Sequence, residues 1–237
     1  MADLKKPCVK ITLTDTKPSV FESKVGGLGY IPHDSTFPTD SEGRQLRLLA
    51  QIDCAEIQLD GFMEKGLLQF WISDVDELYG CDFDNPTNQD YFRVIYYPEV
   101  DTTVTEDEIR NKITNTGKED EEILFPVDRE CGMTFEKSEN PFIDYDAYYF
   151  DDDYEESEEY EDWTVNAGHK VGGCPFYTQF EPRKDEQKKE YDFLLFQLDS
   201  DSNKVMWGDW GIGNFFISSE KLKNRDFSDV FYNWDCG

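Results

Sequence analysis

The segments KVGG at residues 24–27 and LLAQID at residues 48–53 decide the fold, because both recur later in the chain. KVGG returns at residues 170–173 and LLFQLD follows at residues 194–199, so each pair is separated by 146 residues. Eight residues are identical at this one spacing. The repetition predicts that the chain contains two copies of one structural unit.

Two further blocks repeat in the same order. GIGNFFIS at residues 211–218 corresponds to GLLQFWIS at residues 66–73, and VFY at residues 230–232 corresponds to VIY at residues 94–96. Aromatic and β-branched residues dominate these blocks, which favours strands over helices. A β-rich unit of this kind exposes one apolar face of its sheet, and two copies can bury that face against each other.

The blocks therefore predict an α+β fold that is β-rich. We expect mostly antiparallel sheets with short helices, internally duplicated in a pseudo-twofold arrangement. Residues 1–237 would form a single globular domain. Within it, residues 20–100 would be repeat copy one, residues 101–164 an acidic insert without a counterpart in the chain, and residues 165–237 repeat copy two.

Two short helices are expected outside the strands. The stretch 53–59 fits a single short helix. Thr105-Glu-Asp-Glu108 fits a capping box, in which the Thr hydroxyl and the Glu carboxylate each accept from a free backbone N–H. A helix over roughly residues 106–115 would place Ile109 and Ile113 on one face.

Charge is the extreme feature of the composition, with 52 acidic residues, 23 basic ones and a net charge of −29. Proteins bind nucleic acids and anionic membranes through clustered Lys and Arg side chains. A surface as acidic as this one repels both. It attracts a basic protein partner, although the acidity also serves simply to keep a protein soluble and monomeric. In the insert we expect a solvated acidic loop that could hold such a partner through Asp151, Asp152, Asp153, Glu155, Glu156, Glu158 and Glu159.

The lack of a targeting signal in the sequence and the spacing of the cysteines indicate the cellular compartment. No stretch approaches the roughly 20 apolar residues of a membrane helix, and the N-terminus has no apolar run of the kind found in signal peptides. The six cysteines are scattered and form no C-x-x-C pair, which favours reduced thiols. We therefore expect a soluble cytoplasmic monomer.

Phosphate and metal sites are not indicated. Gly26–Gly29 and Gly208–Asn214 lack the Lys-Ser/Thr of a P-loop and the helix of a dinucleotide site, so we expect tight turns there. Asp199–Asn203 resembles the start of a calcium loop, but Lys204 and Trp210 occupy the positions that require Gly and Glu. A hairpin turn is the better interpretation, and with only two histidines zinc is disfavoured. We expect no metal and no cofactor.

Nucleophilic catalysis has one weak candidate pair, Cys174 with His169. The other copy has Leu28 and Ser23 at these positions, so the pair does not belong to the repeated unit. We therefore assign no catalytic residue and favour a protein that is not an enzyme, with an enzymatic site kept as the alternative.

Polar side chains inside the apolar blocks are the remaining candidates. Gln51 and Gln197 are equivalent in the two copies, and Gln69 corresponds to Asn214. Buried amides need hydrogen-bond partners, so these either tie the sheet together or line a cleft between the copies. If a ligand site exists, we expect it in that cleft, with walls formed by Gln51, Gln197, Arg93, Trp207, Asp209 and Asn214.

Several blocks of the chain also resemble a known family. They read KVGGLGYIP, LRLLAQID, GLLQFWIS, VGGCPFYTQ, LLFQLDSD, MWGDWGIGNFFIS and DFSDVFYNWDC. In this order, over roughly residue 20 to the C-terminus, they resemble the YwqG-like family of bacterial proteins, classed as a domain of unknown function. Residues 101–164 contribute no matching block.

The resemblance implies an α+β fold with an internal duplication, and no established reaction, cofactor or catalytic residue. Some similar proteins are encoded near polymorphic toxin systems, which implies an immunity or partner-binding role by association only.

Two hypotheses about function follow. The first is a noncatalytic cytoplasmic binding protein whose acidic face captures a basic partner, such as a toxin. The alternative is a small-molecule-binding or enzymatic site in the cleft between the two repeats.

Overall fold

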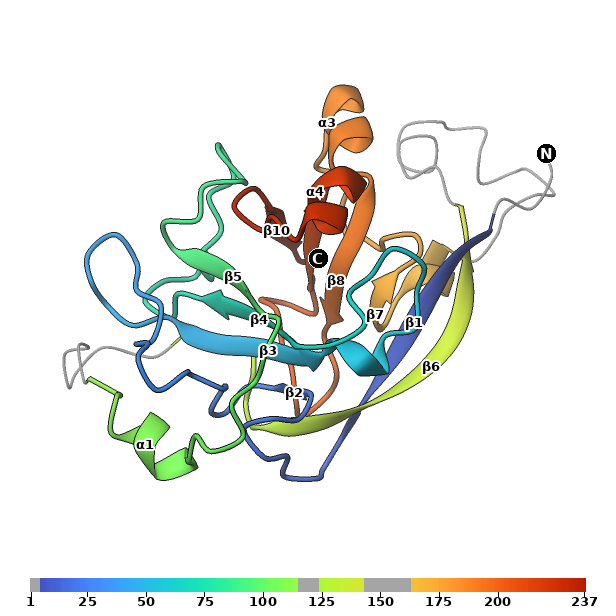
Figure 1. Cartoon of the computed structure of the whole chain (residues 1–237). Coiled ribbons are helices and arrows are strands. Elements are labelled where there is room, and N and C mark those ends of the chain that lie inside the picture. Colours follow the sequence, from blue (N-terminus) through green and yellow to red (C-terminus); the bar gives the residue numbers. More distant parts are fainter. Residues whose placement is uncertain (1–4, 115–123, 143–162) are drawn as a thin grey trace, which may run out of the picture.

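One antiparallel sheet of ten strands organises the chain. The computed structural model describes residues 5–114, 124–142 and 163–237, and within them the strand order is β10-β9-β8-β7-β1-β6-β2-β3-β4-β5 (Figure 1). The strands are β1 (Lys5–Thr14), β2 (Lys24–Val25), β3 (Arg47–Asp53), β4 (Leu67–Ile72), β5 (Phe92–Tyr97), β6 (Cys131–Pro141), β7 (His169–Gly172), β8 (Phe193–Asp199), β9 (Ile212–Ile217) and β10 (Phe231–Asp235). A mostly antiparallel, β-rich fold with short helices is thus confirmed.

Alternation of side chains explains why β1 has one buried face. Val9, Ile11 and Leu13 are buried, whereas Lys10 and Thr12 between them are exposed. Successive side chains of a strand point to opposite faces, so the apolar set of β1 lies in the core. In β4 all six residues are buried, because its sheet is covered on both sides.

The centre of the sheet is formed by β1 and β6, which pair from Lys5↔Pro141 to Thr14↔Gly132. On its other side β1 pairs with β7, and β6 pairs with β2. β6 lies within residues 101–164, for which we expected an acidic insert whose sequence has no counterpart elsewhere in the chain. These residues therefore include a central strand, which follows the alternating sequence of Met133, Phe135 and their neighbours.

Outward from this centre, each side of the sheet continues with four strands in the order in which they follow along the chain. One side runs β6-β2-β3-β4-β5 and the other β1-β7-β8-β9-β10. The pairing of β3 with β4 shifts register between Leu48 and Ala50, and that of β8 with β9 shifts between Leu194 and Phe196. We call residues 24–97, with β2 to β5, the first half and residues 169–235, with β7 to β10, the second half.

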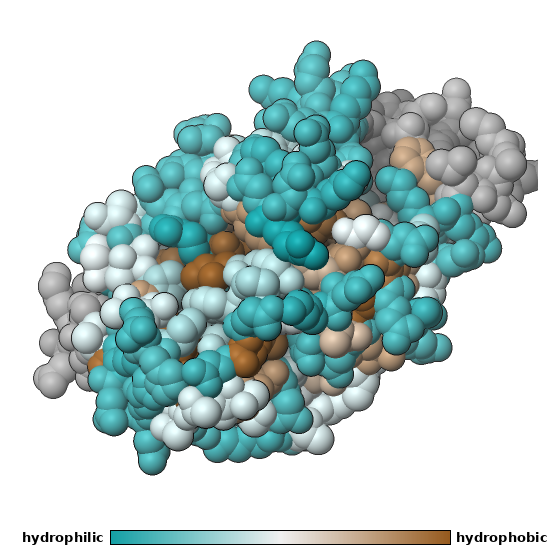
Figure 2. All heavy atoms as spheres, viewed as in Figure 1, coloured by the Kyte–Doolittle hydropathy of each residue, from teal (hydrophilic) through white to brown (hydrophobic). Residues whose placement is uncertain are grey.

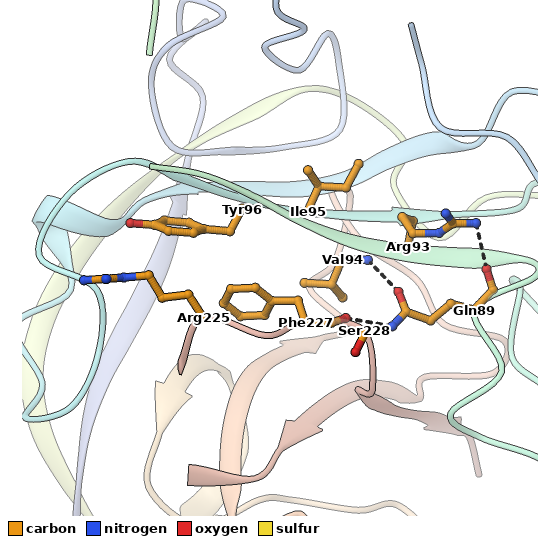
Figure 3. Close-up of a pocket in the computed structure, with 8 residues that line it drawn as sticks. All are labelled: Gln89, Arg93, Val94, Ile95, Tyr96, Arg225, Phe227 and Ser228. Carbon is orange, nitrogen blue, oxygen red and sulfur yellow. Dashed lines mark hydrogen bonds between the residues drawn. The ribbon is translucent and has the colours of Figure 1, made fainter. Parts of the chain in front are cut away.

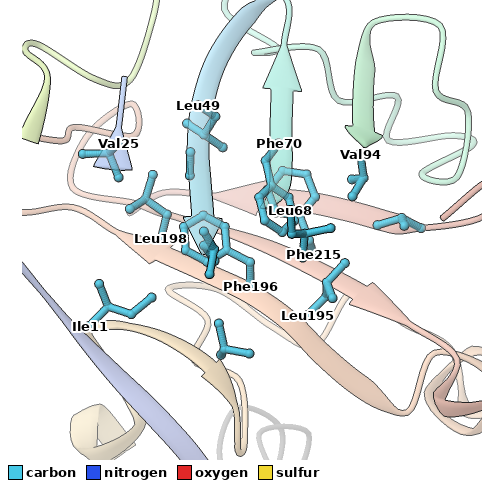
Figure 4. Close-up of a cluster of buried hydrophobic side chains, with 14 of the residues drawn as sticks. Ile11, Val25, Leu49, Leu68, Phe70, Val94, Leu195, Phe196, Leu198 and Phe215 are labelled. Atoms are coloured by element: carbon cyan, nitrogen blue, oxygen red, sulfur yellow. The ribbon is translucent and has the colours of Figure 1, made fainter. Parts of the chain in front are cut away.

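The sheet curls so that inner-face side chains of both halves meet in one core (Figure 4). The ring of Phe70 lies 4.8 Å from that of Phe196 and 4.9 Å from that of Phe215. Phe92 of edge strand β5 contacts Tyr232 of edge strand β10, with 5.1 Å between ring centroids. Aromatic pairs at such distances add to the free energy gained from apolar burial, so the two halves stabilise each other.

The helices are short and lie at the periphery. They are η1 (Cys54–Glu56), α1 (Glu106–Arg110), η2 (Trp163–Asn166), α3 (Asp185–Glu190) and α4 (Ser219–Asn224) (Figure 1). None of the helices in the described ranges is long and apolar enough to cross a membrane.

Helix α1 is shorter than the predicted helix over roughly 106–115. Its N-cap was predicted correctly, since the Thr105 hydroxyl accepts from Glu108 N at 3.2 Å. The Glu108 carboxylate pairs instead with His33 at 2.8 Å. Ile109 is buried but Ile113 is 47% exposed, so packing supports only the first turns of the helix.

Candidate functional site

The amide of Gln51 connects β3 to the loops on either side of β2. Its Oε1 accepts from Tyr30 N at 2.9 Å, and its Nε2 donates to Val20 O and Glu22 O at 3.0 and 2.9 Å. Gln69 donates to the same Oε1 at 2.7 Å. Every polar atom of this fully buried amide is bonded, so its role is structural.

Gln197 makes the same connections in the second half. Its Oε1 accepts from Phe176 N at 2.9 Å, and its Nε2 donates to Asn166 O and Gly168 O at 3.0 and 2.7 Å. Asn214 donates to Phe176 O at 2.9 Å, as Gln69 does to Tyr30 O at 2.8 Å. The predicted polar residues of the blocks thus hold the loops that follow the Gly-Gly turns.

The six predicted cleft residues are not gathered around one hollow. Gln51, Gln197 and Asn214 are completely buried. Trp207 is also buried, with its ring 6.2 Å from that of Trp234. Asp209 is exposed on the loop before β9, and Arg93 lines two hollows of the surface.

The Gly-Gly turns behave as tight turns. At Gly172 and Gly173 the φ angles are 72° and 76°, in the left-handed region that favours glycine. A Cβ on Gly173 would lie 2.8 Å from Cys8 Cβ. The turn therefore lets the chain pass directly against β1.

Two buried lysines precede these turns in different electrostatic settings. Lys24 pairs with Glu130 at 2.8 Å. Lys170 donates to Asn166 O, and in the described part of the chain it forms no ion pair. Burial lowers its pKa from 10.5 to about 7, although Cys8 and Cys174 act in the opposite direction. The ammonium of Lys170 is therefore only weakly stabilised.

The Cys174–His169 pair is unsuited to nucleophilic catalysis. Burial raises the pKa of the Cys174 thiol, so the nucleophilic thiolate is disfavoured. Burial also lowers the pKa of His169 to about 4. Its Nδ1 accepts from Asp199 N at 3.0 Å, as the hydroxyl of Ser23 accepts from Asp53 N at 2.8 Å. The histidine thus serves as a backbone acceptor.

Metal ligands are not assembled in the described ranges, where no group of three His, Cys, Asp or Glu side chains could hold an ion. The predicted turn at Asp199–Asn203 closes with backbone hydrogen bonds between Asp201 and Val205, at 2.9 and 3.1 Å. The predicted partner-binding residues, Asp151 to Glu159, lie outside the described residues.

An open hollow lies along edge strand β5, with a volume of about 440 Å³ (Figure 3). We call it the β5 groove; its lining residues are Gln89, Arg93, Val94, Ile95, Tyr96, Arg225, Phe227 and Ser228. Residues 89–96 belong to the first half and residues 225–228 to the second, so the groove lies between the halves. Its residues other than Arg93 were not predicted as site residues, because nothing in the sequence indicates that the 225–228 segment lies beside β5.

Hydrogen bonds and rings connect the two walls of the β5 groove. Gln89 Nε2 donates to Phe227 O at 2.8 Å, and Gln89 Oε1 accepts from Val94 N at 3.2 Å. The rings of Tyr96 and Phe227 lie 5.8 Å apart. Elsewhere on the face seen in Figure 2, hydrophilic residues cover most of the surface and hydrophobic ones show mainly between them near its middle.

Comparison with known proteins identifies a family but assigns it no function. No curated protein matches the sequence. A family model does match residues 23–236, which include β2 to β10 and both walls of the β5 groove. The chain therefore belongs to the family described as Domain of unknown function (DUF1963).

Proposed function

We propose that this protein is a noncatalytic binding protein whose acidic surface captures a basic protein partner. The net charge of −29 carries the proposal, because a field of this strength accelerates and orients the approach of a positively charged surface. The structural roles of Gln51, Gln197 and His169 and the burial of Cys174 support a noncatalytic protein.

Titration calorimetry with a basic protein of pI above about 9, in salt from roughly 20 to 300 mM NaCl, tests this function. We expect a complex that weakens steeply as salt rises. Absence of binding at low salt, or affinity indifferent to salt, contradicts the proposal.

A charge-matched pair of variants locates the contact. In one variant the seven acids of the 151–159 run are changed to Asn or Gln, and we expect it to bind most weakly. The control removes seven exposed acids outside the run: Asp34, Asp60, Glu64, Glu77, Asp84, Glu136 and Glu186. Equal losses in the two variants would assign binding to total charge and not to the run.

We propose further that the chain is internally duplicated, with a pseudo-twofold relation between its halves. The bonds of Gln51 and Gln197 support this, since their three backbone partners also differ by 146 residues. Gln51→Leu and Gln197→Leu each leave these partners unbonded, and we expect similar losses of about 2–4 kcal/mol in urea unfolding. Strongly unequal losses would argue against equivalent roles.

The name YwqG-like, a bacterial origin, a cytoplasmic location and a toxin-immunity role remain parts of this proposal. The quoted sequence blocks support the name, and the five buried free cysteines are compatible with a reducing compartment. Co-purification of the protein with a toxin encoded beside its gene would test the immunity role, and a toxin that remains fully active in its presence would contradict it.

A small-molecule-binding or enzymatic site between the halves is the second candidate function. The β5 groove favours it, because residues of both halves form its walls. A thermal-shift screen with small organic anions tests it: we expect a ligand that raises the melting temperature of the protein but not of Arg225→Gln. A screen without any such anion counts against a small-molecule site.

A further inference from the structure

Two arginines stand apart in the charge distribution. Five of the seven arginines form ion pairs with carboxylates: Arg44, Arg47, Arg110, Arg129 and Arg183. Arg93 and Arg225 have no such partner in the described part of the chain. Within the described ranges Arg93 donates only to backbone carbonyls, Gln89 O at 3.1 Å and Phe92 O at 3.4 Å. With 52 acids in the protein, two arginines without a carboxylate partner among the described residues are unexpected.

Both of these arginines line the β5 groove, and among the described residues no carboxylate does. Figure 3 shows Arg225 at the end of the groove beside Tyr96 and Arg93 at the end beside Gln89. Between them lie Val94 and the ring of Phe227. The groove is therefore a positive, partly apolar site on a protein that is otherwise strongly negative.

The backbone of β5 adds unpaired hydrogen-bonding groups to this site. Tyr91 O accepts from Ser73 N at 2.8 Å, so odd-numbered residues of β5 direct their backbone groups toward β4. Even-numbered residues direct theirs away, and Val94 N is already bonded to Gln89. Val94 O and Tyr96 N make no hydrogen bond with the described residues. A strand edge of this kind can pair with another extended chain.

The surface is hollowed beyond the β5 groove as well. A second hollow of about 470 Å³ shares Arg93 and Ile95 with it, and the 36–41 loop forms its other wall. Its two acids are Asp90 and Asp40, and the Asp40 carboxylate is paired with Arg44 at 2.7 Å. Because both hollows lie along β5 and share Arg93 and Ile95, the site suits an elongated occupant better than a compact one.

We propose that the β5 groove binds an extended acidic peptide segment of a partner protein. The segment adds as a strand to the edge of β5, where Val94 O accepts and Tyr96 N donates a hydrogen bond. Its carboxylates pair with Arg93 and Arg225 through charge-assisted hydrogen bonds. This inference uses the groove of the second candidate function and commits it to a peptide.

Fluorescence anisotropy with hexapeptides of Val and Thr that carry two Glu residues at varied spacing tests the proposal. The label is uncharged, and the control peptides carry Gln in place of Glu. We expect at least one Glu peptide to bind, and Arg93→Gln or Arg225→Gln to weaken it roughly tenfold or more. Arg129→Gln is the matched control, because this exposed arginine pairs with Asp15 away from the groove.

Backbone pairing is tested separately by N-methylating alternate residues of the best peptide, which we expect to abolish binding. Absence of binding by every Glu peptide overturns the proposal, as does equal binding of the Gln or N-methylated versions. Equal binding of free glutarate overturns the peptide but leaves a small-molecule groove. Should an arginine variant fail to fold, the Glu and Gln peptides on the unaltered protein still decide the question. Binding of a basic protein is expected to be undiminished in Arg225→Gln, so failure of the acidic-surface function is recognised independently.

Discussion

Replacing Lys170 by Met should stabilise the protein, although it removes a buried hydrogen bond. The lysine is 1% exposed, and burial lowers its pKa from 10.5 to about 7. A shift of this size corresponds to about 5 kcal/mol of unfavourable free energy for the ammonium at low pH. Asn166 O loses the Lys170 donor but keeps the one from Gln197 at 3.0 Å, so the substitution leaves no carbonyl without a partner.

The pH dependence has a defined sign. Between pH 7 and 9 the unfolded chain keeps the Lys170 proton while the folded protein releases it, so folding becomes more favourable as pH rises. Relative to Lys170→Met, the unaltered protein should gain about 2 kcal/mol over this range. Below pH 7 the penalty is fully present, and the advantage of the Met variant is largest.

Lys24→Met is the matched control, because Lys24 is also 1% exposed and also precedes a Gly-Gly turn. Its removal leaves Glu130, its partner at 2.8 Å, without a cation, and takes the donor from Pro18 O and Leu28 O. We expect this variant to be destabilised by about 3 kcal/mol. Urea unfolding followed by tryptophan fluorescence at pH 7 and 9 measures all three proteins. Equal destabilisation by the two Met substitutions, or no change with pH in the difference between wild type and Lys170→Met, would refute the reasoning.

Three further predictions concern the scaffold. A thiol reagent should label Cys236 first in the native protein, because the other five cysteines are buried; rapid labelling of two or more thiols would contradict this. Gly173→Ala should lower the melting temperature more than Gly43→Ala does. Both glycines have a positive φ, at 76° and 84°, but a Cβ at position 173 would contact Asn140 and Cys8 whereas one at position 43 would contact nothing. Equal melting temperatures would show that these contacts are unimportant. Thr105→Ala should cost about 1 kcal/mol by removing the N-cap of α1, and an unchanged urea midpoint would show that packing of Ile109 alone holds the helix.

Local sequence pattern was sufficient for most of the strands. The GLLQFWIS block becomes β4 (Leu67–Ile72), and its counterpart becomes β9 (Ile212–Ile217). Paired glycines predicted turns, which the φ angles of Gly172 and Gly173 confirm. The capping box gave the start of α1 but not its length, because the end depends on which isoleucine finds a core.

The candidate site could be predicted only in part. Arg93 was singled out from its block, but Arg225 lies in a segment without a pattern and is remote in sequence. Composition gave no reason to single out both arginines, since their significance is that neither has a carboxylate partner in the part of the chain that the structure describes. Whether an arginine has an ion-pair partner depends on which residues lie near it in the folded protein. Neither the periodicity of the sequence nor the spacing of its motifs indicates this.

The sequence by itself determined the strand blocks, the Gly-Gly turns and the paired amides, because each depends on side chains a few residues apart. Only the tertiary structure decided that β6 lies beside β1 at the centre of the sheet, and that β5 and the 225–228 segment form one groove. The physical reason is that these contacts join residues more than one hundred positions apart. The burial of a shared hydrophobic core holds these distant segments together. The local conformational preferences of the chain do not determine which segments meet.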